Sequence, residues 1–132
     1  MKYELTKELE TGNSIIDREH KELFQAVNQM IDACSGGKGR TAMEPAIQFL
    51  LSYVDKHFAH EEQLQQMNNY PDIAAHKMFH AGYTRKLREI ISAIPAAGPS
   101  IADVGKLNQH IAVLVTHIKT EDKKMSTFLK RT

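Results

Sequence analysis

The sequence predicts an all-α fold, an up-down-up-down four-helix bundle formed by a single domain of residues 1–132. Four long segments repeat apolar residues at helical spacing, and short stretches rich in glycine, proline or asparagine separate them. Short connections make consecutive helices run antiparallel, and a chain of 132 residues can bury one core. An N-terminal arm is expected over residues 1–15, and helices roughly over 17–35, 42–67, 71–94 and 101–130.

The first two helices have recognisable ends. Asp17 is the expected N-cap of the first helix, and Gly36–Gly37 should end it, because glycine readily adopts the left-handed conformation found at helix C-termini. The second helix is expected to open on a capping box of Thr41 and Glu44. Asn68–Asn69 should end it.

The last two helices are bounded by prolines and a cap. Pro71 can occupy a first helical turn, and Pro95 cannot continue a helix, so the third helix should lie between them. Ser100 and Asp103 have the spacing of a capping box for the fourth helix.

Composition excludes several classes of partner. The net charge of +1 offers no basic field for nucleic acid or an anionic membrane, and no segment reaches the length of a membrane span. The charged segment 1–10 lacks the apolar centre of a signal peptide, so a cytoplasmic location is expected. Cys34 is the only cysteine, which excludes an internal disulfide and a thiolate metal cluster. A monomer or weak homo-oligomer is expected, and the sequence identifies no protein partner.

Ligand-type side chains occupy helix faces that should be purely apolar. His57 and Glu61 are four residues apart, so both project from one face, as do His76 and His80. Burying such groups without a common partner is costly. The full set of predicted metal ligands is His20, His57, Glu61, His76, His80, His117 and Asp122.

The donor set predicts two metal ions. Five imidazoles and two carboxylates are too many for one ion, whereas two ions bridged by carboxylates can use them, and nitrogen with carboxylate donors suits iron or manganese. Two octahedral ions need about twelve bonds, of which the histidines, two bridging carboxylates and one bridging oxygen supply about eleven. One open position suits a small diatomic ligand, and the predominance of neutral imidazole favours reversible binding over oxidation.

Four segments together resemble the hemerythrin family, particularly its bacterial single-domain members. They are IDREH at 16–20, HFAHEE at 57–62, YPDIAAHKMFH at 70–80 and HIKTED at 117–122. The resemblance covers nearly the whole chain. It implies two non-heme irons joined by an oxo or hydroxo bridge, which bind dioxygen reversibly for carriage, storage or sensing.

The resemblance also implies a role for each ligand. A six-coordinate iron would be held by His76, His80 and His117. A five-coordinate iron would be held by His20 and His57, and the carboxylates of Glu61 and Asp122 would bridge the two irons. The implied oxygen pocket is apolar. It comprises Leu23, Phe58, Leu114 and Ile118.

The chain departs from the family pattern at two positions where bacterial relatives often carry tryptophan. They correspond to Tyr3 and Val113. Val113 is expected to border the oxygen pocket, where its small side chain would leave a gap. His60 and His110, on the flanks of their helices, are expected to be partly solvated or to support ligands. Glu62 is expected to be a surface carboxylate, and a hydrogen-bond acceptor for a ligand is its less favoured alternative role.

Two other functions remain open at this point. The same site could belong to an enzyme that reduces peroxide, nitric oxide or oxygen with an external electron donor, although the sequence contains no buried general acid besides the ligands and no flavin or rubredoxin-like module. Catalytic residues are therefore not expected. Iron storage or repair is a weaker alternative, because five nitrogen ligands disfavour easy metal release.

Overall fold

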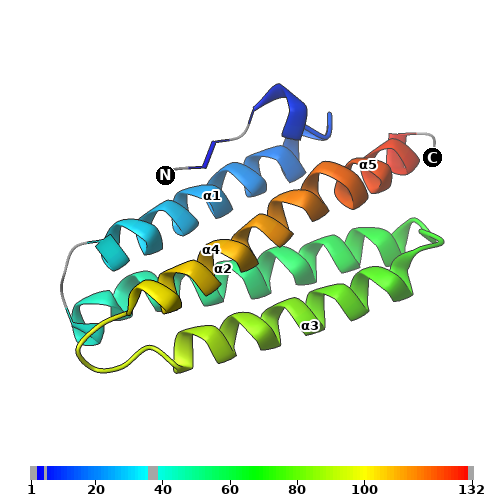
Figure 1. Cartoon of the computed structure of the whole chain (residues 1–132). Helices are drawn as coiled ribbons and strands as arrows, with labels where there is room; N and C mark the ends of the chain where they lie inside the picture. The colour runs from blue at the N-terminus through cyan, green and yellow to red at the C-terminus, as the bar shows by residue number, and fades with distance from the viewer. Residues whose placement is uncertain (1–2, 5, 36–38, 131–132) are drawn as a thin grey trace.

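The computed structural model describes residues 3–4, 6–35 and 39–130, and in these ranges the chain is helical with no strand (Figure 1). The long helices are α1 (Ser14–Ser35), α2 (Arg40–Met67), α3 (Ile73–Ser92) and α4 (Ile101–His117). A short 3-10 helix, η1 (Lys7–Leu9), precedes them; a π-helical segment, η2 (Ile118–Asp122), and α5 (Lys123–Lys130) follow. Because α4, η2 and α5 continue one another, they form one helical rod, and the bundle consists of four such rods: α1, α2, α3 and this last one. This arrangement confirms the predicted fold class.

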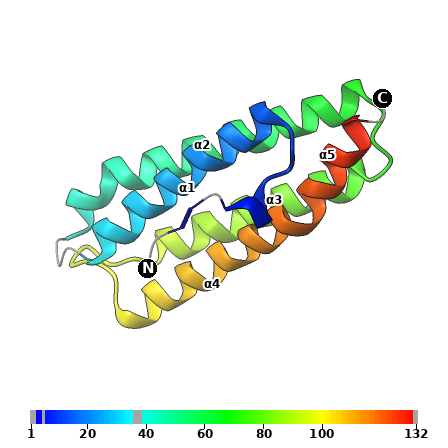
Figure 2. The same ribbon diagram turned by 90° about the horizontal axis from the view of Figure 1, so that it is seen from above.

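The N-terminal arm lies along the bundle between α1 and α4 (Figure 2). The backbone of Tyr3 forms a reciprocal pair of hydrogen bonds with the Asn28 side chain, at 2.7 and 2.8 Å. Further along the arm, Glu8 on η1 forms an ion pair with Lys119 on η2. The arm therefore bridges the first and last rods.

Helix α1 begins three residues earlier than predicted because Asn13 caps it. The Asn13 Oδ1 atom accepts hydrogen bonds from the backbone N–H groups of Ile15 and Ile16, both at 3.1 Å. The prediction that Asp17 is the cap was wrong. Asp17 lies within the first turn and instead accepts from Thr11 N and Oγ1 at 2.8 Å and from Gly12 N at 3.2 Å. The expected stop at residues 36–37 lies outside the described residues.

Helix α2 begins at Arg40, so the capping box expected from Thr41 and Glu44 was also wrong. The start is fixed by tertiary contacts, because the Arg40 guanidinium donates to the carbonyl groups of Ile91, in the last turn of α3, and of Ile94, just after α3. At its other end α2 stops at Met67, and Asn69 adopts a left-handed φ of 54°.

Helix α3 begins at Ile73, two residues after the predicted start, because Pro71 and Asp72 form a turn. It ends at Ser92, two residues before the predicted end. The capping box of α4 is present as predicted. Ser100 N donates to Asp103 Oδ2 at 2.9 Å, and Asp103 N donates to Ser100 Oγ at 3.1 Å.

The inward faces of the helices form a continuous apolar core, with a smaller cluster where α5 packs. The main core includes Leu23, Met30, Ile47, Leu87 and Ile111. The smaller cluster is built on Ile16, Tyr70 and Met125. No helix of the described residues is both long enough and apolar enough to span a membrane.

Candidate metal centre

All seven predicted ligands converge inside the bundle. Each helix rod contributes, and every one of these side chains belongs to a residue that is at most 5% exposed. They are His20 on α1, His57 and Glu61 on α2, His76 and His80 on α3, His117 on α4 and Asp122 on η2.

One half of the centre contains two histidines. His57 Nε2 lies 3.3 Å from Glu61 Oε2, and His20 Nε2 lies 3.6 Å from the same oxygen. His20 Nε2 is also 3.1 Å from Asp122 Oδ2. Nitrogen and oxygen atoms of these four residues lie close enough together to share one ion.

The other half contains three histidines facing the opposite carboxylate oxygens. His80 Nε2 lies 3.3 Å from Glu61 Oε1. His76 Nε2 and His117 Nε2 lie 3.5 and 3.2 Å from Asp122 Oδ1. Each carboxylate thus presents one oxygen to each half of the centre.

The chemistry of the donor set fits metal ions. All five histidine Nε2 atoms, both Glu61 oxygens and Asp122 Oδ1 are buried and lack a hydrogen-bond partner within the described part of the chain. A buried polar atom without a partner costs about 1–3 kcal/mol. These atoms face one another, so bound cations would satisfy all of them together.

The electrostatics of the metal-free centre point the same way. Burial alone would lower the pKa of His57, but the adjacent Glu61 and Glu19 carboxylates outweigh burial and raise it to about 10. Burial would raise the pKa of Glu61 and Asp122, yet the histidines hold both well below their usual range. The pocket therefore retains two buried, charged carboxylates that attract cations. Protons on the histidines compete with metal ions for these carboxylates.

The comparisons with known proteins agree with this geometry. Residues 11–129 match the family model for the hemerythrin HHE cation binding domain. The chain belongs to the hemerythrin family. A bacteriohemerythrin of Pseudomonas aeruginosa is 32% identical over 117 residues, which cover 87% of this chain and 73% of the relative. A bacteriohemerythrin of Stenotrophomonas maltophilia is 29% identical, covering 88% and 74%, and a myohemerythrin of Theromyzon tessulatum is 24% identical, covering 92% and 89%.

In this member of the hemerythrin family a π-helical segment aligns the last two candidate ligands. His117 and Asp122 are five residues apart, and an α-helix would rotate them by about 140° from each other. The i to i+5 turns of η2 bring positions five apart into register, so both side chains face the same centre. On a regular α-helix the same spacing would place them at opposite edges of the inward face.

One carboxylate forms a hydrogen bond to a ligand histidine from outside the centre, and a second carboxylate lies near another ligand histidine. Glu62 Oε2 accepts from His80 Nδ1 at 2.9 Å, which is the less favoured of the two roles expected for Glu62. Glu19 lies 2.8 Å from His60 Nδ1 and 3.7 Å from His57 Nδ1. Glu19 was not predicted from the sequence because its contacts join α1 to α2 and follow no spacing within one helix.

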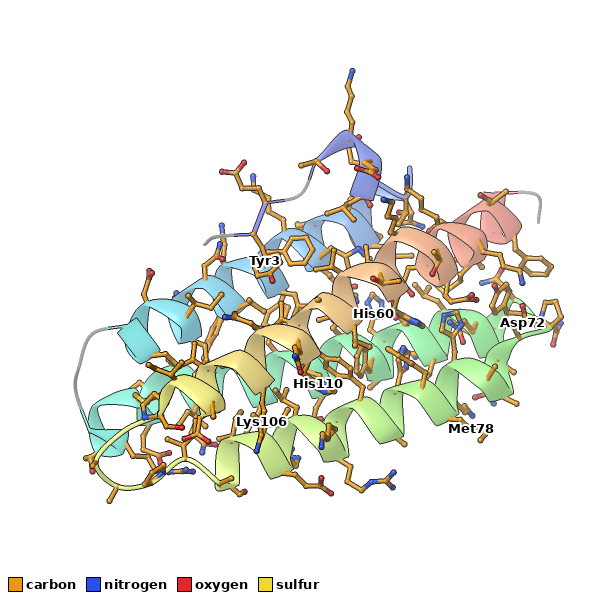
Figure 3. The ribbon with its side chains drawn as sticks, in the orientation of Figure 1. Tyr3, His60, Asp72, Met78, Lys106 and His110 are labelled. Atoms are coloured by element: carbon orange, nitrogen blue, oxygen red, sulfur yellow. The ribbon has the colours of Figure 1, made fainter. Side chains whose placement is uncertain are left out.

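The two remaining histidines of this hemerythrin-family chain, His60 and His110 (Figure 3), form their contacts with groups outside the candidate ligand set. His60 on α2 has a side chain 34% exposed and is held by Glu19. His110 on α4 stacks on Tyr83, with ring centroids 3.8 Å apart, and its Nε2 atom donates to the Tyr83 carbonyl at 2.9 Å. Both therefore lie outside the candidate ligand set, as the sequence predicted.

The four residues expected to form an apolar wall are buried. Leu23, Phe58, Leu114 and Ile118 are at most 4% exposed, and Phe58 stacks on the His80 imidazole with centroids 3.9 Å apart.

Val113 does not lie with them. It is 47% exposed, so the expectation that its side chain borders an interior pocket was wrong. Leu114 occupies the inward face, and the next residue back along an α-helix is rotated by about 100° from it. Val113 consequently lines a surface hollow with Phe79 and Thr116. Tyr3, the other departure from the family pattern, is half-buried against Phe24, with ring centroids 6.2 Å apart.

Proposed function

We propose that this chain holds two non-heme iron ions in the candidate centre and binds dioxygen reversibly, as a carrier, store or sensor. The observation that carries the proposal is the division of the carboxylate oxygens. Glu61 and Asp122 each present one oxygen to the two-histidine half and the other to the three-histidine half. Two carboxylates placed in this way can bridge two ions and fix their separation.

The proposed ligand set leaves one coordination position open. His76, His80 and His117 would hold one ion, and His20 and His57 would hold the other, with an oxo or hydroxo bridge between them. Counting this bridge and both carboxylates, about eleven of about twelve positions are filled. The open position would belong to the two-histidine half, which has one imidazole fewer.

The surrounding residues suit a binding protein. When bound, a reduced iron pair supplies the redox chemistry that reversible dioxygen capture requires. The chain supplies an apolar enclosure, since Leu23, Phe58, Leu114 and Ile118 are buried and bring no polar side chain that could donate a proton. Excluding water in this way favours release of the bound gas over its reduction.

The test is reconstitution of the wild-type protein with ferrous iron in the absence of oxygen, followed by exposure to air. We expect two irons per chain and a visible charge-transfer band that disappears on deoxygenation and returns on re-exposure. The His60→Gln variant is the matched control and should behave like wild type. Absence of a reversible band would exclude the proposal. Sustained consumption of a reductant with peroxide, nitric oxide or oxygen would indicate a reductase instead.

A further inference from the structure

A fully buried amide touches one of the candidate ligands. Gln65 is 0% exposed and follows Glu61 by one turn of α2. Its Nε2 atom lies 2.9 Å from His76 Nδ1 on α3 and 2.9 Å from Met125 Sδ on α5. One uncharged side chain therefore joins three elements directly behind His76.

Metal binding constrains what His76 can present to Gln65. When Nε2 of a neutral imidazole binds a metal, the ring proton resides on Nδ1, which then needs a hydrogen-bond acceptor. When the proton resides on Nε2 instead, Nδ1 accepts and needs a donor. An amide can supply either group, because half a turn about its terminal bond exchanges Nε2 and Oε1.

This rotation would change the partners of the Gln65 amide. Its Oε1 atom has no hydrogen-bond partner among the residues that the structure describes, so no hydrogen bond to Oε1 is lost. The contact between Nε2 and the Met125 sulfur is lost, and a thioether is a weak acceptor.

We infer that Gln65 is a positioning residue for His76, whose buried amide holds the imidazole in its metal-binding orientation both before and after metal enters. This inference rests on the metal binding proposed above. A methionine of similar length could fill the same space but could not orient the ring, and a carboxylate could serve only the form that carries a proton on Nδ1.

The choice of an amide also has an electronic consequence. His80 is supported by the Glu62 carboxylate at 2.9 Å, whereas His76 is supported by a neutral group. A carboxylate behind a ligand histidine raises its basicity. His76 is therefore the weaker donor of the two, and a carboxylate at position 65 should favour the ferric over the ferrous state of the iron.

The first experiment compares Gln65→Glu and Gln65→Met in the iron-loaded protein. Gln66→Glu and Gln66→Met are the controls, because Gln66 is the exposed neighbour on the same helix. We expect Gln65→Glu to lower the reduction potential and Gln65→Met to release iron to a chelator about tenfold faster. Neither control should move either quantity. Equal changes at positions 65 and 66, or none at position 65, would overturn the inference.

The second experiment does not depend on iron chemistry. In the zinc-loaded wild-type protein, the His76 Nδ1 proton should resonate downfield as a hydrogen-bonded imidazole proton, and Gln65→Met should move it upfield. An unchanged resonance would show that Gln65 does not hold the ring. Failure to bind dioxygen reversibly would refute the proposed function without affecting this measurement, so the two failures are distinguishable.

Discussion

At the scale of single residues, this centre depends on two carboxylates that each serve both halves. Glu61 Oε2 and Oε1 face His57 and His80 respectively, both at 3.3 Å. Asp122 Oδ2 and Oδ1 face His20 and His117, at 3.1 and 3.2 Å. Loss of one carboxylate would therefore remove a donor from both ions of the proposed pair at once.

The first prediction is that Glu61→Ala or Asp122→Ala abolishes loading of a metal pair. His60→Ala should retain it, since His60 contacts Glu19 outside the centre. Metal analysis of protein reconstituted under identical conditions measures the difference. Equal iron loss in all three variants would mean that the carboxylates do not bridge.

The second prediction concerns Glu62, which supports His80 from outside. Glu62→Gln keeps the shape but removes the charge that makes His80 a stronger donor, so metal affinity should fall by about tenfold. Glu89→Gln, an exposed carboxylate on α3, is the control and should leave the affinity unchanged. Competition against a chelator gives both values, and an unaltered affinity in Glu62→Gln would show that this hydrogen bond is not used.

At the scale of elements, the π-helical segment determines how the last rod faces the core. The π-helical turn of η2, between His117 and Asp122, contains one residue more than an α-helical turn would. After it, Met125 and Ser126 are both 0% exposed. The extra residue therefore sets both the metal-facing register and the face that α5 buries.

The third prediction is that deleting Thr120 strongly destabilises the protein. The deletion returns the segment to α-helical register and rotates α5 by about 100°, which turns Met125 away from the core. Loss of such a buried side chain typically costs about 2–5 kcal/mol. Urea unfolding of metal-free protein measures this cost. Thr120→Ala keeps the chain length, so it should change stability by less than about 0.5 kcal/mol. Similar losses in the two variants would contradict the role given to the extra residue.

At the scale of the whole molecule, the proposed metal pair would link folding to metal binding. The centre draws buried ionisable groups from α1, α2, α3, α4 and η2, so a bound metal pair ties every rod to the others. A metal that binds only the folded chain stabilises it in proportion to its binding free energy.

The fourth prediction is that the metal-free protein has a narrower range of pH stability than the metal-loaded protein. The carboxylates, with lowered pKa, stabilise the fold above their ordinary pKa values of 3.8 and 4.5, and this contribution is lost as pH falls through their folded values. His57, whose pKa is raised, contributes its full stabilisation of the fold below pH 6.5, and this stabilisation disappears as the pH rises towards about 10. The metal-free protein should therefore be most stable between about pH 4.5 and pH 6.5, where both contributions are present.

Urea midpoints measured across pH test this expectation. In the metal-loaded protein the alkaline decline should be absent, because metal ions replace the histidine protons as partners of the carboxylates. An identical alkaline decline in the two forms would show that the metals do not occupy these histidines.

The amino-acid sequence is sufficient to establish the fold class and the seven residues that meet. Residues four apart on a helix must share a face, so helical periodicity alone pairs His57 with Glu61, and His76 with His80. Tertiary packing, by contrast, selects the groups that stand behind these side chains. Glu62 and Gln65 reach the histidines of α3 because of how α2 and α3 are rotated and offset against each other. The direction of the Val113 side chain likewise depends on how α4 is rotated about its own axis. The apolar periodicity of the sequence determines this rotation only to within a fraction of a turn.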